Sequence, residues 1–107
     1  MLPQNRRIPR LLYPKLLKGT MFVGDLISLR VGANSESASR FSVSVSKKVA
    51  KKANTRNRLR RVVYEMVREH IQEIKDKALI QFVFRKTPKN KKEIESAFGE
   101  LLNKIKK

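Results

Sequence analysis

The chain has 107 residues, which is enough for one small domain with one modest hydrophobic core. Its 26 Lys and Arg against 9 Asp and Glu give a formal net charge of +17, which favours binding to nucleic acid or to an anionic membrane surface. A hydrophobic content of 40% excludes an intrinsically disordered chain, and the absence of cysteine excludes disulfides and thiolate metal sites.

The first ten residues are basic and contain two prolines. Arg6, Arg7 and Arg10 lie in this stretch, which we predict to be an irregular basic arm. The arm is a solvated terminus, a segment that contacts RNA, or both. It lacks the apolar centre of a signal peptide, and no apolar run approaches the roughly 20 residues that span a bilayer. We therefore expect a cytoplasmic protein that does not enter a membrane.

Residues 11–19 predict a short first helix. Leu12 and Leu16 stand four residues apart, so both fall on one helix face, and Gly19 is suited to end the helix. Pro14 is compatible with a helix only in its first turn. The helix is therefore expected to be short, or to begin near Tyr13.

Two segments have the alternating pattern of half-buried strands. In residues 23–31 the apolar face consists of Ile27, Leu29 and Val31. In residues 40–46 it consists of Phe41, Val43 and Val45. The serines between the latter are expected to face solvent, or else to form a floor of small residues under a nucleic-acid strand. The polar residues 32–39 favour an antiparallel hairpin between the two strands.

A long amphipathic helix is expected after this, with Asn54 or Thr55 as its N-cap. Apolar side chains recur three and four residues apart, at Leu59, Val62, Val63, Met66, Val67, Ile71 and Ile74. At about 100° per residue, the opposite face carries Asn57, Arg61, Tyr64 and Arg68. The only histidine, His70, lies in the apolar stripe and is expected to pack rather than to catalyse.

The start of this helix lies in the most basic stretch of the chain, residues 46–64, which contains no Asp or Glu. Its basic residues are Lys47, Lys48, Lys51, Lys52, Arg56, Arg58, Arg60 and Arg61. Like charges at this density repel one another unless a polyanion binds them. The N-terminus of a helix adds partial positive charge and free backbone N–H groups. The stretch therefore predicts a phosphate-binding surface.

Residues 79–85 have apolar side chains on both faces, which predicts an interior strand. The last helix is expected over residues 91–105, with Thr87 or Asn90 at its start. The order helix, strands, helix, strand, helix predicts a single-domain α+β sandwich over residues 1–107, with a sheet of about four strands. The strands that flank the central helix are expected to be parallel, and the usual rule makes such a crossover right-handed.

No group of residues has the pattern of a protein catalytic centre. The sequence contains no Cys/His cluster, no Gly-rich phosphate loop and no Ser-His arrangement typical of hydrolases. The residue pattern alone predicts an RNA- or DNA-binding domain. RNA is favoured, because no motif that reads DNA half-sites is present.

Two motifs occur together in this region: Ser44-Val45-Ser46-Lys47-Lys48 at a strand end, and Arg56-Asn57-Arg58-Leu59-Arg60-Arg61 in the helix that follows. At this spacing they resemble the protein component of bacterial ribonuclease P, and the order of elements is similar across the chain. The resemblance implies the protein subunit of a ribonucleoprotein endoribonuclease that removes 5′ leaders from precursor tRNA. The RNA subunit would carry the chemistry and hold most of the Mg²⁺, and the protein would have no catalytic residue. The resemblance also implies a monomeric protein within the ribonucleoprotein and a left-handed βαβ crossover, against the usual rule.

The resemblance also assigns roles to residues. The family motifs imply RNA contact by Lys47, Lys48, Arg56, Asn57, Arg58, Arg60 and Arg61, and the neighbouring basic positions add Lys51, Lys52 and Arg68. The cleft for the 5′ leader is expected to involve Leu12, Tyr13, Leu16, Ser44 and Ser46.

The sequence departs from the family pattern at three places. Leu12 and Leu16 align with positions where phenylalanine is usual, and Tyr64 stands where a further arginine is common. Lys51 and Lys52 replace a Gly-Asn pair.

Two other functions are consistent with the size, charge and predicted fold. One is a ribosomal or ribosome-assembly protein that binds RNA without a role in cleavage. The other is a stand-alone nuclease, which the missing catalytic constellation disfavours.

Overall fold

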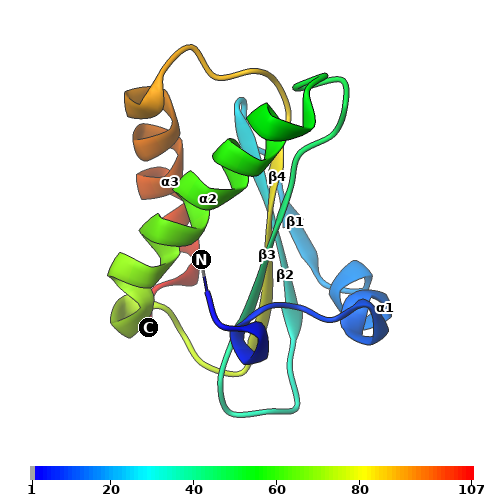
Figure 1. The fold of residues 1–107 in the computed structure, drawn as a ribbon. Helices are drawn as coiled ribbons and strands as arrows, with labels where there is room; N and C mark the ends of the chain where they lie inside the picture. The colour runs from blue at the N-terminus through cyan, green and yellow to red at the C-terminus, as the bar shows by residue number, and fades with distance from the viewer. Residues whose placement is uncertain (1) are drawn as a thin grey trace.

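The computed structural model describes residues 2–107 (Figure 1). The helices are α1 (Tyr13–Leu17), α2 (Ala53–His70) and α3 (Lys91–Ile105). The strands are β1 (Thr20–Phe22), β2 (Ile27–Ala33), β3 (Arg40–Ser44) and β4 (Ala78–Phe84). Short 3-10 turns lie at Gln4–Arg6, Arg10–Leu12 and Ile71–Glu73. The strands form one mixed sheet in the order β1-β2-β4-β3, so the fold is a single α+β domain, as predicted.

Strand β4 is interior, as its apolar residues on both faces predicted. It pairs antiparallel with β2, with Leu29 opposite Phe82, and parallel with β3, with Val43 opposite Phe82. The predicted hairpin between residues 23–31 and 40–46 is therefore wrong, because β4 lies between those two strands. A strand that is apolar on both faces buries more surface inside a sheet than at its edge.

The first strand prediction, residues 23–31, has the right face but the wrong bounds. Ile27, Leu29 and Val31 do face the main core, but the strand begins only at Ile27. A separate strand, β1, precedes it and pairs antiparallel with it, with Thr20 opposite Val31. With three residues, β1 is too short to show an alternating pattern in sequence.

Helices cover both faces of the sheet (Figure 1). Helices α2 and α3 lie on one face, and the short α1 lies on the other. Alternate residues of β4 serve the two faces: Ile80 and Phe82 belong to the main core under α2 and α3, whereas Leu79 packs in a smaller cluster beneath α1. The Phe82 ring stacks on Phe98 of α3, with ring centroids 5.4 Å apart.

Helix α2 connects the parallel strands β3 and β4, and the crossover is left-handed (Figure 1). The rule-based expectation of a right-handed crossover is wrong, and the hand implied by the resemblance is confirmed. The N-cap lies earlier than expected: Lys52 occupies that position, two residues before Asn54 and three before Thr55, so both of these lie in the first turn. In α3, by contrast, Asn90 is the N-cap, and its side-chain oxygen accepts a 3.0 Å hydrogen bond from the amide of Glu93.

The buried face of α2 follows the predicted stripe with one addition. Leu59, Val63, Met66 and Val67 are buried, as expected. Tyr64 was expected on the exposed face but is only 7% exposed. Its flank of the helix packs at the edge of β3, so the helix is buried over a wider arc than the stripe indicated.

Residues 2–8 run along the outer edge of β3. The amide of Ile8 donates to the carbonyl oxygen of Phe41 at 2.9 Å, and Nε of Arg6 donates to the carbonyl oxygen of Ser39 at 2.9 Å. Leu2 and Ile8 are buried. The alternative of a solvated terminus is therefore wrong for these residues, whereas RNA contact by the basic arm stays a prediction.

Two glycines predict opposite effects of the same substitution. A Cβ atom at Gly19 would lie 1.9 Å from the carbonyl oxygen of Val31, whereas Gly99 in α3 has no neighbouring atom within 4 Å. Gly19→Ala should lower the free energy of unfolding by about 1–3 kcal/mol, because backbone must shift. Gly99→Ala should raise it by about 0.5–1 kcal/mol through helix propensity. Urea denaturation of the two variants measures both changes, and equal signs would contradict the packing described for Gly19.

Candidate nucleic-acid interface

The loop between β3 and α2, residues 45–52, turns tightly and is anchored in the core. The carbonyl oxygen of Ser46 accepts hydrogen bonds from the amides of Val49 and Ala50, both at 3.1 Å. The side chains of Val49 and Ala50 are buried in the main core. The apolar residues of this basic loop therefore fix its path.

Two side chains bind the loop from outside. The hydroxyl of Thr87, which follows β4, donates to the carbonyl oxygen of Val49. Nη1 of Arg56 donates to the carbonyl oxygens of Ala50 and Lys51, at 3.0 and 2.8 Å. Arg56 is thus a structural clamp on the loop as well as a candidate RNA contact.

With the loop backbone held in this way, its lysines face solvent. Lys47, Lys48, Lys51 and Lys52 are all exposed. Lys52 is the N-cap of α2 and makes no side-chain cap hydrogen bond. The loop therefore presents four ammonium groups beside the positive end of the helix dipole.

The exposed face of α2 continues this surface. Asn57, Arg58, Arg61 and Arg68 are exposed, and Arg60 is half-buried on the flank. Nη1 of Arg60 donates to Oδ1 of Asn57 at 2.7 Å, which orients both side chains. The sequence-predicted residues are therefore close together from Lys47 to Arg61, whereas Arg68 lies two helical turns further along.

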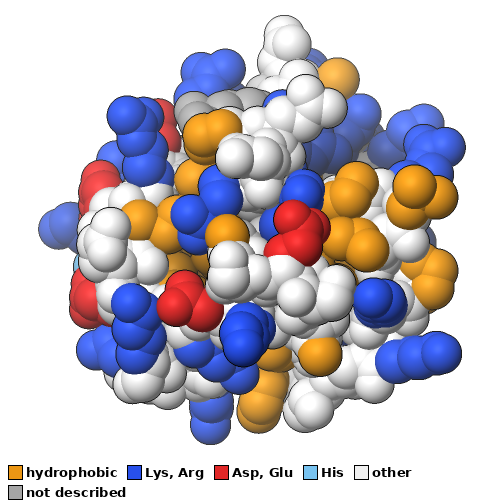
Figure 2. Space-filling model, turned by 90° about the horizontal axis from the view of Figure 1, so that it is seen from below, with side chains coloured by type: hydrophobic (Ala, Val, Ile, Leu, Met, Phe, Trp, Pro, Cys, Tyr) orange, Lys and Arg blue, Asp and Glu red, His pale blue; other side chains and the backbone are white. Residues whose placement is uncertain are grey.

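The protein's own acids do not neutralise this surface. Within residues 2–107 the ion pairs are Arg40–Glu36, His70–Glu73, Lys86–Asp25 and Lys106–Glu73, and none includes a residue of 46–64. Figure 2 shows the opposite end of the molecule, where acidic side chains are interspersed with Lys and Arg.

Two acidic groups outside this surface have shifted pKa values. A hydrogen bond from Lys86 lowers the pKa of the Asp25 carboxyl. The hydrogen bond with His70 lowers the pKa of Glu73. Both groups are exposed, and both shifts arise from contacts away from residues 46–64.

The residues expected to form the leader cleft differ in their exposure to solvent. Tyr13 of α1 is half-buried, and its hydroxyl shares a 2.9 Å hydrogen bond with the Ser42 hydroxyl. Leu16 is 0% exposed, in the cluster with Ile8 and Leu79, and so offers no surface to a ligand.

The other expected cleft residues keep some access to solvent. Leu12 and Ser44 are half-buried, and Ser46 is exposed at the loop turn. Ser42 is only 6% exposed, so the expectation of a solvent-facing serine side is wrong at that position, because α1 covers it.

Sequence reasoning missed one part of the charged surface near α2. Arg7 and Arg40 line a pocket with Arg60 and Tyr64, between the N-terminal segment and α2. Burial raises the pKa of Tyr64, with the Arg7 charge acting in the opposite direction, so the phenol stays protonated at neutral pH. The only signal in the sequence was the arginine content of residues 1–10. Within residues 2–107, no cluster of three or more His, Asp or Glu side chains is placed to hold a metal ion.

Comparison with known proteins identifies the family. A family model described as ribonuclease P matches residues 14–106, which is most of the chain. The chain belongs to the ribonuclease P protein family. No curated protein matches the chain at a significant level.

Solved structures of bacterial ribonuclease P proteins share the fold. A mutant protein from Staphylococcus aureus matches with a TM-score of 0.84 and 22% identity, covering 95% of this chain and 91% of that chain. The protein from Thermotoga maritima matches with a TM-score of 0.75 and 24% identity, covering 94% and 98%. At these identities the structures show the shared fold, and the family implies an RNA partner. No helix within residues 2–107 is long and apolar enough to cross a membrane.

Arg56 and Arg58 were both predicted as RNA contacts, but only Arg56 forms hydrogen bonds to the loop, so their substitutions should differ in stability. Arg56→Ala removes two hydrogen bonds from a charged donor to loop carbonyls, so it should lower the free energy of unfolding by about 1–2 kcal/mol. Arg58→Ala removes an exposed side chain, so the change should stay within about 0.5 kcal/mol. Urea denaturation measures both, and equal losses would show that the Arg56 bonds contribute nothing to stability.

Proposed function

We propose that this protein is the protein subunit of ribonuclease P, which binds the catalytic RNA and the 5′ leader of precursor tRNA. In this function it assists RNA-catalysed, metal-dependent removal of the leader. The observation that carries the proposal is the surface made by residues 46–61 in a chain of this family. There, exposed Lys and Arg side chains lie on a fixed loop and helix end without internal acidic partners.

The chemistry of this surface suits binding rather than catalysis. Guanidinium groups match phosphate oxygens in bidentate geometry, and clustered cations release counterions from RNA on binding. The proposed RNA contacts are Lys47, Lys48, Lys51, Lys52, Arg56, Asn57, Arg58, Arg60, Arg61 and Arg68. Mg²⁺ would be held mainly by the RNA subunit, and the protein would act as a cytoplasmic monomer within the ribonucleoprotein.

The proposed leader contacts are fewer than the sequence indicated. The candidates that keep some exposure are Leu12, Tyr13, Ser44 and Ser46. Leu16, by contrast, is buried and packs α1 against Leu79 of the sheet. Tyr13 offers an aromatic ring, and aromatic rings stack on unpaired bases. Its hydroxyl bond to Ser42 holds that ring against the sheet face.

A three-way cleavage assay tests the proposed function. Precursor tRNA is incubated at physiological magnesium with protein alone, with a bacterial ribonuclease P RNA alone, and with both. We expect cleavage only where the RNA is present, and faster cleavage when the protein is added. The readout is the rate of appearance of the released 5′ leader.

The other outcomes favour other functions. If the protein binds RNA but does not change cleavage by the catalytic RNA, a ribosomal or ribosome-assembly role is favoured. If the protein alone cleaves, a nuclease function is favoured. The similar S. aureus structure is of a mutant with defective mRNA degradation activity, so the protein-alone reaction should include an mRNA substrate as well.

Removing exposed arginines from α2 should weaken assembly with the catalytic RNA. Arg58→Gln combined with Arg61→Gln should reduce affinity at least about tenfold, and should reduce the slope of log affinity against log salt by about two. The matched control is Lys104→Gln with Lys107→Gln, which removes the same charge near the C-terminus. Filter binding over a range of salt concentrations measures the affinity and its salt dependence. Equal losses of affinity in the two double variants would show that only the net charge matters, and not the position of the arginines.

A further inference from the structure

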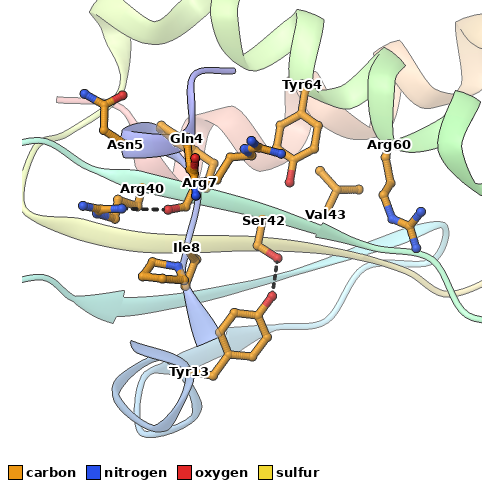
Figure 3. Close-up of a pocket in the computed structure, with 12 residues that line it drawn as sticks. Gln4, Asn5, Arg7, Ile8, Tyr13, Arg40, Ser42, Val43, Arg60 and Tyr64 are labelled. Atoms are coloured by element: carbon orange, nitrogen blue, oxygen red, sulfur yellow. Dashed lines mark hydrogen bonds between the residues drawn. The ribbon is translucent and has the colours of Figure 1, made fainter. Parts of the chain in front are cut away.

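A pocket lies beside the proposed RNA surface, between the N-terminal segment, the edge of β3 and the flank of α2 (Figure 3). Its volume is about 740 Å³, within the range of pockets that hold small molecules or single groups of larger ones. We call it the N-terminal pocket. Its polar lining includes Asn5, Arg7, Tyr13, Arg40, Arg60 and Tyr64.

The wall contributed by the N-terminal segment is firmly attached. The side chain of Arg40 donates from Nη1 to the carbonyl oxygen of Arg7 at 3.0 Å, and the amide of Ile8 bonds to the carbonyl oxygen of Phe41. The Arg6 guanidinium lies over the Phe41 ring, 5.9 Å from its centroid. The pocket is therefore built into the fold and does not depend on a loose terminus.

The pocket is positively charged. Arginines line it from three separate elements: Arg7 from the N-terminal segment, Arg40 from β3 and Arg60 from α2. No Asp or Glu is among the residues described as lining it. Lining cations attract an anion, and within residues 2–107 only Arg40 of the three has an acidic partner, Glu36.

Arg7 is the group whose bonding is incomplete. Its Nε is buried, and within residues 2–107 no acceptor forms a hydrogen bond with it. Arg40 and Arg60, by contrast, have acceptors at Glu36 and Asn57. Figure 3 shows the Arg7 side chain extending from the N-terminal segment toward Tyr64. A buried donor without an acceptor is unfavourable. The outer Nη groups of the same guanidinium are the ones that a ligand oxygen in the pocket can reach.

The surroundings of Arg7 select the kind of anion. The planar fork of a guanidinium binds two oxygens of a phosphate at once. The Asn5 amide lines the same pocket, and the Tyr64 hydroxyl stays protonated there, so both can donate to further oxygens. Through Arg60 the pocket adjoins the exposed face of α2, where the proposed RNA surface begins.

We propose that the N-terminal pocket binds a phosphate group of an RNA strand through Arg7, with Arg40 and Arg60 supplying the surrounding positive charge. The identity of the ligand as RNA rests on the proposed function. The phosphate could belong to the catalytic RNA or to precursor tRNA, and the experiments below distinguish these two sources.

The first experiment needs no RNA. Inorganic phosphate is titrated into the protein at constant ionic strength, and the Nε–H signals of arginine side chains are followed by NMR. The Arg7 signal should shift with saturation, because phosphate bound at the Nη groups would change the environment of the neighbouring Nε–H. The Arg6 signal is the control and should stay in place, because its Nε already donates to Ser39. An unmoved Arg7 signal would contradict phosphate binding in the pocket and would leave the proposed function unaffected.

The second experiment compares two variants that remove the same charge from the same segment. Arg7→Gln should weaken RNA binding about tenfold and lower the salt slope by about one, as expected for one lost phosphate contact. Arg10→Gln changes an exposed arginine of the same segment outside the pocket and should lower the slope by less than Arg7→Gln does. Arg7→Lys should restore most of the slope, because it keeps the positive charge. Thermal unfolding of each variant checks that the fold is retained.

Two binding measurements with these variants show which RNA supplies the phosphate. Weaker binding of Arg7→Gln to the catalytic RNA alone assigns it to that RNA. Normal assembly followed by weaker binding of precursor tRNA, but not of mature tRNA, assigns it to the leader. If wild-type protein assembles and accelerates cleavage while Arg7→Gln behaves like Arg10→Gln in both arms, the pocket proposal fails and the proposed function stands. If wild-type protein does not bind the catalytic RNA, the proposed function fails instead.

Discussion

The pairing of β4 on both of its edges is the constraint on which the rest of the structure depends. Because β3 lies parallel to β4, the chain must return to the opposite end of the sheet before β4 can begin. Helix α2 makes that return, so its N-terminus necessarily lies beside the end of β3. The basic loop and the arginines of the first turns are brought together by this topology, and no direct contact between basic side chains is needed.

The basic loop is held by the least polar parts of its own sequence. Val49 and Ala50 are buried in the core, while Thr87 and Arg56 bind the loop carbonyls. The conformational entropy of the loop backbone is therefore lost when the protein folds, before any ligand arrives. A surface ordered in advance binds more tightly than a flexible tail with the same charges, because less freedom remains to be lost on association.

The sequence predicted those features that depend on local periodicity. The apolar stripe of α2 and the two-faced pattern of β4 are repeated signals, and the structure confirms both. Pairing between β2 and β4 joins residues far apart in sequence, so the polar residues 32–39 wrongly suggested a local hairpin. The burial of Tyr64 likewise depends on a neighbouring strand edge that helical periodicity does not describe.

For the candidate site, exposure of the basic residues could be predicted, but their internal bonds could not. The hydrogen bonds of Arg56 and the attachment of residues 2–8 to β3 arise only in the folded chain. The three residues of β1 carried too little pattern to reveal a strand. The burial of Leu16 and Ser42 depends on contacts with other elements, which local periodicity does not describe.

The lack of internal acidic partners around residues 46–64 has a consequence for the free protein. Each cation there raises the energy of its neighbours, so the folded chain carries stored electrostatic repulsion when it stands alone. Added salt relieves that repulsion and at the same time competes with RNA for the same groups. Higher ionic strength should therefore stabilise the fold of the isolated protein and weaken its complex with RNA. The dilute buffers that favour assembly are those in which the free subunit is least stable.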